Sequence, residues 1–113
     1  MNSNYDQRVL IDTDTLSWES TEQAGFFKKL LSSRDNAETA LIELKANTVL
    51  SPSSKINSVE LLVLEGSYIN EFGEFPQGSY LRLGAEDESS VRTTQGCIVF
   101  RKINYFNDEN SAS

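Results

Sequence analysis

Short segments with the pattern of β-strands, separated by turn residues, run through most of this chain. Residues 39–46 alternate between apolar and polar side chains, which is typical of a strand with one buried face. Residues 59–64 are almost continuously apolar and indicate a central strand that ends at Glu65 and Gly66. Further strands are predicted at residues 8–12, 78–83 and 97–100. Many short strands joined by turns predict an all-β sandwich or barrel.

The sequence pattern is ambiguous at residues 22–31 and indicates a turn at residues 70–73. Residues 22–31 place apolar side chains at spacings that a helical turn can use, but Gly25 interrupts the pattern. A short helix and a strand therefore both stay open there. Residues 68–75 predict a tight hairpin whose turn lies at residues 70–73.

The length and composition fit one globular domain. The 113 residues suffice for one hydrophobic core but not for two independent ones. Hydrophobic residues make up 38% and charged residues 24%, a balance typical of folded chains. We expect one domain over residues 1–106 and a polar tail at 107–113.

The charge excludes two classes of partner. A net charge of -7, with the basic residues scattered, argues against binding nucleic acid or an anionic membrane. The single cysteine, Cys97, cannot form an intramolecular disulfide, and it begins an apolar strand as a small buried side chain would. No apolar stretch has the length of a signal peptide or membrane span, so we expect a cytoplasmic protein.

The chain contains no histidine. This absence rules out acid–base catalysis by an imidazole and every metal site that uses histidine ligands. The acidic run at residues 86–88 lacks the spaced oxygen ligands of a calcium loop, and we interpret it as a solvated turn.

Three segments together resemble the ChrR-type cupins, a family of domains found in an anti-sigma factor and in relatives of acetylacetone-cleaving dioxygenases. These segments are residues 60–68, 73–80 and 96–100, and weaker similarity extends upstream through Trp18, residues 27–30 and residues 39–42. The resemblance implies an all-β cupin, in which two antiparallel sheets roll into a small jelly-roll barrel. It also implies a homodimer.

The resemblance further assigns the metal ligands of the family to four positions of this chain. The family's two histidines of a His-x-His motif correspond to Ser53 and Lys55, its glutamate to Val59 and a later histidine to Ser89. Serine hydroxyls are poor ligands for zinc or iron, valine has no lone pair, and a lysine ammonium repels a cation. We therefore expect no metal and no other cofactor.

Glu60 lies next to the substituted glutamate position but does not replace it. Successive side chains of a strand point to opposite faces, so if Val59 faces the barrel interior, Glu60 faces away from it. A one-residue bulge can reverse this orientation.

The former metal positions and their neighbours predict a mostly apolar pocket suited to a small organic molecule. Lys55 there is either a buried amine with chemical reactivity or, as we prefer, a loop lysine turned to solvent. Arg82 either lines the pocket with Tyr80 or pairs with the acidic run that follows. The predicted pocket residues are Ser53, Lys55, Val59, Leu61, Tyr80, Arg82, Ser89 and Val91, with Val63 on the same strand face.

These observations favour a metal-free cupin domain that binds a small molecule or acts as a regulatory module, without catalytic residues. The alternative is a metal-dependent, dioxygenase-like enzyme that uses unrecognised ligands. A third interpretation is a structural or partner-binding cupin whose barrel is filled by its own side chains. Anti-sigma activity by this chain alone is not expected, because the zinc-binding helical domain that accompanies it in the family is absent from this sequence.

Overall fold

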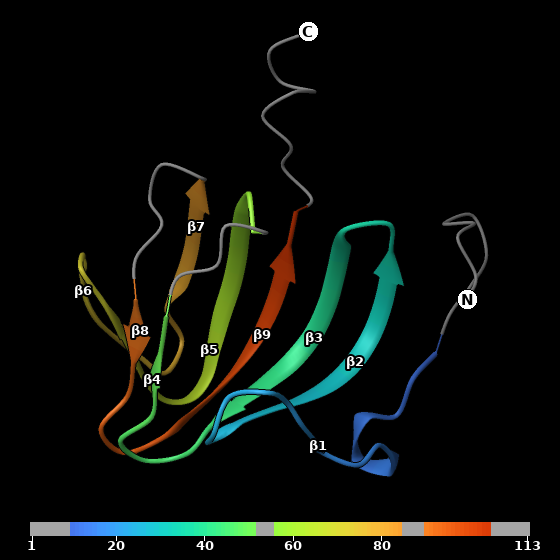
Figure 1. Ribbon diagram of the computed structural model, residues 1–113, viewed down its shortest axis with the longest axis horizontal. Coiled ribbons are helices and arrows are strands. Elements are labelled where there is room, and N and C mark those ends of the chain that lie inside the picture. The colour runs from blue at the N-terminus through green and yellow to red at the C-terminus, as the bar shows by residue number, and fades with distance from the viewer. Residues whose placement is uncertain (1–9, 52–55, 85–89, 105–113) are drawn as a thin grey trace, which may run out of the picture.

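The computed structural model describes residues 10–51, 56–84 and 90–104, in which strands dominate (Figure 1). Among these residues, no helix is long and apolar enough to cross a membrane. The predicted tail at 107–113 and the acidic run at 86–88 lie outside the described residues. The elements are η1 (Thr13–Thr15), β1 (Glu19–Ser20), β2 (Phe26–Arg34), β3 (Ala37–Leu44), β4 (Val49–Leu50), β5 (Ser58–Asn70), β6 (Gly73–Pro76), β7 (Tyr80–Gly84), β8 (Val91–Arg92) and β9 (Cys97–Ile103).

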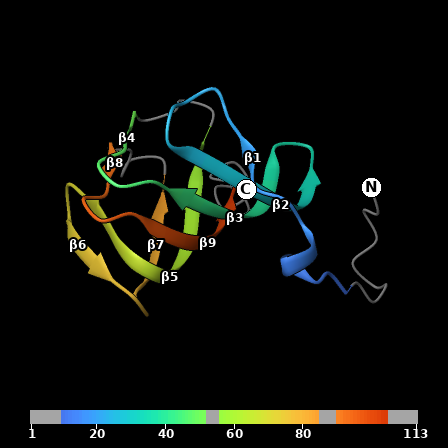
Figure 2. The ribbon, with the colours of Figure 1, turned by 90° about the horizontal axis from the view of Figure 1, so that it is seen from below.

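The strands form one antiparallel sheet that curls into a half-barrel, with β4, β6 and β8 facing β2, β3 and β9 across the interior (Figures 1 and 2). The strand order is β1-β2-β3-β9-β5-β8-β4, and β6 and β7 pair with β5. The predicted all-β architecture is confirmed.

The long strand β5 connects the two halves of the barrel. Its first part pairs with β7 and β9, and its last residues pair with β6 and β8. Between these parts, the register with β9 shifts at Val63 and Glu65, as in a β-bulge. A bulge bends and twists its strand, which lets β5 turn from one half to the other.

Two local predictions are settled by strand pairing. The segment at residues 22–31 contributes a strand, not a helix: β2 pairs along β3 from Phe26 opposite Leu44 to Arg34 opposite Ala37. The sequence predicts a strand at residues 8–12, of which the structure describes residues 10–12. These three residues form no strand, so the prediction is wrong for them. There the Asp12 carboxylate accepts a hydrogen bond from the Asp14 backbone at 3.0 Å and caps η1 instead.

The core lies on the concave face of the sheet. Leu61 and Val63 of β5 pack there with exposed fractions of 0% and 1%, and Val99 of β9 lies opposite Val63 with 1% exposed. Ile42 and Leu44 of β3 complete the set of largest fully buried side chains. The alternation predicted for residues 39–46 is confirmed, because Ile42 and Leu44 are buried whereas Glu43 is not.

Gly66, at the end of the predicted central strand, allows two backbones to approach closely. Its φ of +75° lies in the left-handed region, and a Cβ atom there would lie 2.0 Å from the carbonyl oxygen of Gly96. Only glycine fits without moving the backbone of β9.

We predict that Gly66→Ala lowers the free energy of unfolding by more than about 2 kcal/mol, because backbone strain and a clash with a carbonyl add together. Gly78 has a φ of +93° but open space around its Cα. Gly78→Ala is therefore the matched control and should cost only about 1 kcal/mol. Urea denaturation of both variants measures the difference, and equal losses would show that the close approach at Gly66 is unimportant.

Candidate functional site

The position that the resemblance assigns to the metal-binding glutamate lies in an apolar environment. Val59 is on the inner face of β5, opposite Leu83 of β7 and Ile103 of β9, and packs against the core. The other assigned positions, Ser53, Lys55 and Ser89, lie outside the described residues. Within the described ranges, no three His, Cys, Asp or Glu side chains gather into a group that holds a metal ion.

Glu60 points away from the interior, as strand alternation predicts. One of its carboxylate oxygens accepts a short hydrogen bond from the Tyr80 hydroxyl on the outer face. The bulge of β5 begins at Val63, beyond Glu60, so it does not turn this carboxylate inward. Glu60 therefore offers no ligand to the interior.

The remaining predicted pocket residues separate into two groups. Leu61, Val63 and Val91 face the interior, where they pack with the core. Tyr80 pairs with Leu62 and Arg82 with Glu60, and all four side chains lie on the outer face. The expectation that Tyr80 and Arg82 line the interior is therefore wrong. The sequence shows that they alternate with Leu81 and Leu83, and the register with β5 turns the leucines inward.

The polar centre of the interior consists of two cations and one carboxylate. Lys28 lies opposite Ile42, and Arg101 lies between Ala40 and Leu61, so both share the face of the buried core. The Lys28 Nζ lies 3.0 Å from Glu38 Oε1 and 3.1 Å from Oε2. The Arg101 Nη2 lies 3.4 Å from Glu38 Oε2. One carboxylate thus bridges two cations across β2, β3 and β9.

The guanidinium of Arg101 is largely removed from solvent. Its side chain is 13% exposed, and its Cζ lies 5.8 Å from the centre of the Phe26 ring, within range of a cation–π interaction. The Nε atom is buried and finds no hydrogen-bond acceptor in the described part of the chain. Burial lowers the pKa of Arg101, and the neighbouring Glu38 opposes this shift. Arginine nevertheless remains protonated in proteins.

Tyr68 brings a neutral hydroxyl to the same interior. Burial raises the pKa of Tyr68 to about 12, and the positive charge of Arg101 partly offsets this rise. The phenol therefore stays protonated at neutral pH and is a hydrogen-bond donor rather than a charge.

A surface hollow of about 400 Å³ reaches the inner face of β2. Residues 20–23, from the end of β1 and the turn after it, form its outer wall, and Phe26 and Lys28 form its inner wall. These two inner side chains are the same ones that contact Arg101 and Glu38. The hollow therefore lies next to the charged group, with Phe26 and Lys28 between them.

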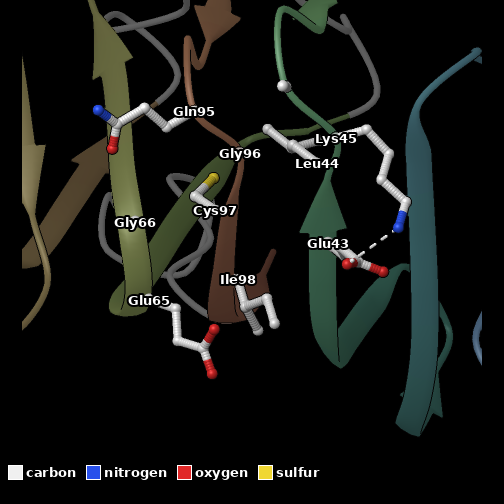
Figure 3. A pocket seen from close by; sticks show the side chains of 10 residues that line it. Glu43, Leu44, Lys45, Glu65, Gly66, Gln95, Gly96, Cys97 and Ile98 are labelled. Carbon is white, nitrogen blue, oxygen red and sulfur yellow. Dashed lines mark hydrogen bonds and ion pairs between the residues drawn. The ribbon is translucent and has the colours of Figure 1, made fainter.

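A second hollow, of about 270 Å³, lies where β3, β5 and β9 converge (Figure 3). Cys97 lines it and is 4% exposed, which confirms its interpretation as a small buried side chain. Burial raises the pKa of Cys97 to about 11, although a hydrogen bond with Thr93 opposes the rise. A protonated thiol is a weak nucleophile, so this hollow lacks an activated group. Its lining residues are Glu43, Leu44, Lys45, Ala46, Glu65, Gly66, Gln95, Gly96, Cys97 and Ile98.

The sequence interpretation missed Lys28, Glu38, Tyr68 and Arg101. A signal was present in β9, where Cys97, Val99 and Ile103 share one strand face and Arg101 occupies the same face. A basic residue on an otherwise apolar face indicates a buried charge.

A family model described as "ChrR Cupin-like domain" matches residues 6–107, most of the chain. The chain belongs to the ChrR cupin-like family. This confirms the resemblance carried by residues 60–68, 73–80 and 96–100. A search of curated proteins found no match.

Solved structures show the same cupin fold. A chain from the complex of Rhodobacter sphaeroides SigE with the anti-sigma ChrR is 17% identical, with a TM-score of 0.71 over 82% of this chain. This cupin spans 52% of that chain, about half its length. A putative acetylacetone dioxygenase from Methylibium petroleiphilum PM1 is 13% identical, with a TM-score of 0.74 over 91% of this chain and 81% of that one. KdgF from a Halomonas species is 11% identical, with a TM-score of 0.70, and the match covers 91% of this chain and 99% of that one.

The raised pKa of Cys97 predicts how stability depends on pH. The unfolded thiol ionises at its ordinary pKa of about 9, whereas the folded thiol stays protonated until about 11. The unfolded state therefore binds fewer protons in this window, and stability falls as pH rises through it. Between pH 8 and pH 10 the loss from this group is about 1 kcal/mol.

Cys97→Ala should show a smaller decrease in unfolding free energy over the same interval, whatever its stability at pH 8. Denaturant titrations of both proteins at pH 8, 9 and 10 make the comparison. Parallel pH profiles would mean that the thiol is not buried as described.

Proposed function

We propose that this cupin domain binds a small organic molecule or acts as a regulatory module, without a metal and without catalysis. The observation that carries the proposal is the charge of the interior. Lys28 and Arg101 place two cations around the single carboxylate of Glu38. A metal site needs an excess of lone-pair donors and negative charge, and this group has the opposite composition.

The residues at the family's ligand positions support the same conclusion. Val59 packs against the core and has no lone pair to offer. The resemblance places Ser53, Lys55 and Ser89 at the remaining positions, and none of these side chains is a strong ligand for zinc or iron. The proposed domain therefore keeps the cupin scaffold but not the family's metal chemistry.

We predict that the purified protein remains metal-free after incubation with iron, nickel, manganese or zinc and gel filtration. A variant that restores the family's ligands, with Ser53→His, Lys55→His, Val59→Glu and Ser89→His, should gain metal if the assigned register is right. Elemental mass spectrometry gives the metal content of both. Near-stoichiometric metal in the unaltered protein would contradict the proposal.

A dioxygenase-like enzyme is the second candidate, favoured by the similarity of fold to the putative acetylacetone dioxygenase. It requires a metal held by ligands other than those assigned, so the measurement of metal content separates the two candidates.

Regulation through a protein partner is also part of the proposal, given the similarity to a chain of the SigE–ChrR complex. A cytoplasmic location fits the unpaired, buried thiol of Cys97.

We also propose that the domain forms a homodimer through the outer face of the sheet. Leu41, Phe100, Leu62 and Tyr80 lie side by side on that face, in register across β3, β9, β5 and β7. Leu62 is 37% exposed and Tyr80 is 52% exposed, so an apolar row remains accessible to solvent. Towards β2, Trp18 already covers part of this face by contacting Lys29, 4.8 Å from the ring centre.

Replacing Leu62 with lysine should convert the predicted dimer to a monomer, because a charge would be buried at the centre of the interface. Val49→Lys is the control, since Val49 is 64% exposed but lies on β4 in the opposite half of the barrel. Light scattering coupled to gel filtration gives the mass of each protein. A monomeric unaltered protein would refute the dimer.

A further inference from the structure

We propose that the barrel interior holds the carboxylate group of a small apolar acid, bound by Arg101 and Lys28. This inference deepens the proposed function and depends on it, because it names the chemical class of the ligand. It rests on the charge balance, the hydrogen bonding of Arg101 and the hollow beside Phe26.

The charge balance of the interior favours an added anion. Lys28 and Arg101 carry two positive charges, and Glu38, which contacts both, supplies one negative charge. Among the described residues, the neutral phenol of Tyr68 beside Arg101 adds no charge that would offset this excess. The Lys28 side chain is 31% exposed, so solvent screens part of its charge, but the Arg101 side chain is only 13% exposed. A bound carboxylate would neutralise the charge of Arg101, which is costly to bury.

The hydrogen bonding of Arg101 leaves a donor for that carboxylate. Its contact with Glu38 uses Nη2 alone and is long, at 3.4 Å. Its Nε atom is buried and has no acceptor among the described residues. A guanidinium binds a carboxylate through two parallel N–H donors, and Nε belongs to one edge that can do so. An incoming carboxylate would therefore satisfy a donor that has no acceptor in the part of the chain that the structure describes.

The surroundings indicate an apolar body for the ligand. The Phe26 ring lies against the Arg101 guanidinium and also lines the hollow of about 400 Å³. Lys28 lines the same hollow and reaches Glu38. Glu22 brings one carboxylate to the wall of the hollow, but it is exposed to solvent. The Lys28 side chain on the inner wall is 31% exposed, and Arg101, behind Phe26, is 13% exposed. A ligand in this hollow would place its apolar part on Phe26, and its acid group would reach Arg101 by passing the Phe26 ring.

Benzoate and benzamide are suitable probes, because they share a ring and differ in charge at one group. We expect benzoate to bind the full-length protein at least tenfold more tightly than benzamide in calorimetric or NMR titrations. Arg101→Met should abolish this preference. Arg92→Met, which removes an exposed arginine of β8 and changes the net charge equally, should retain it.

Direct observation of the Arg101 side chain keeps the proposal testable if Arg101→Met does not fold. In ¹⁵N-labelled protein, the Nε–H resonance of Arg101 should shift on addition of benzoate and not of benzamide. Equal affinity for both probes would overturn the carboxylate site and leave the proposed small-molecule function standing. If neither probe binds, this inference is wrong, and the metal analysis decides the proposed function separately.

Discussion

The alternation of side chains along β5 and β9 is the constraint on which the interior depends. Once Leu61 and Val63 face inward, pairing with β9 requires that Arg101 and Val99 face inward as well. Strand alternation turns Glu60 outward, and pairing of β5 with β7 places Tyr80 on the same outer face. A shift of one residue in this register would exchange the two sets and bury a different group of charges. The chemistry of the interior therefore follows from backbone pairing as much as from residue type.

An arginine in this position is costly for stability. Its guanidinium lies 5.8 Å from the centre of the Phe26 ring, and its backbone pairs with Ala40 and Leu61. It shares the carboxylate of Glu38 with Lys28. A buried ion pair gives little or no net stabilisation compared with apolar side chains of similar volume. Because this charged group adds little to the stability of the fold, we propose that its role is to bind a ligand.

Much of the fold followed from sequence patterns. The alternation at residues 39–46 and the apolar run at 59–64 specify strands through burial on one or both faces, and both strands are present as β3 and β5. The segment at residues 22–31 stayed ambiguous because its apolar spacing fits a helix or a strand, and only the pairing with β3 decides between them. Asp12 showed the limit of local patterns, since its capping of η1 replaces the expected strand.

The candidate site was less accessible from the sequence. Val59 packs against the core, but no sequence motif connects Lys28, Glu38 and Arg101, which come from three strands. Which face of β7 is turned inward depends on its register with β5, so Tyr80 and Arg82 were assigned to the wrong side. These failures share one cause: tertiary pairing, not composition, decides which polar side chains meet.

The most direct test of a cationic, metal-free interior is anomalous diffraction from crystals grown with zinc and benzoate. We predict no anomalous peak inside the barrel and carboxylate density against the Arg101 guanidinium. A zinc peak in the interior, beside Val59, would contradict it and would show that the domain retains the metal chemistry of its family.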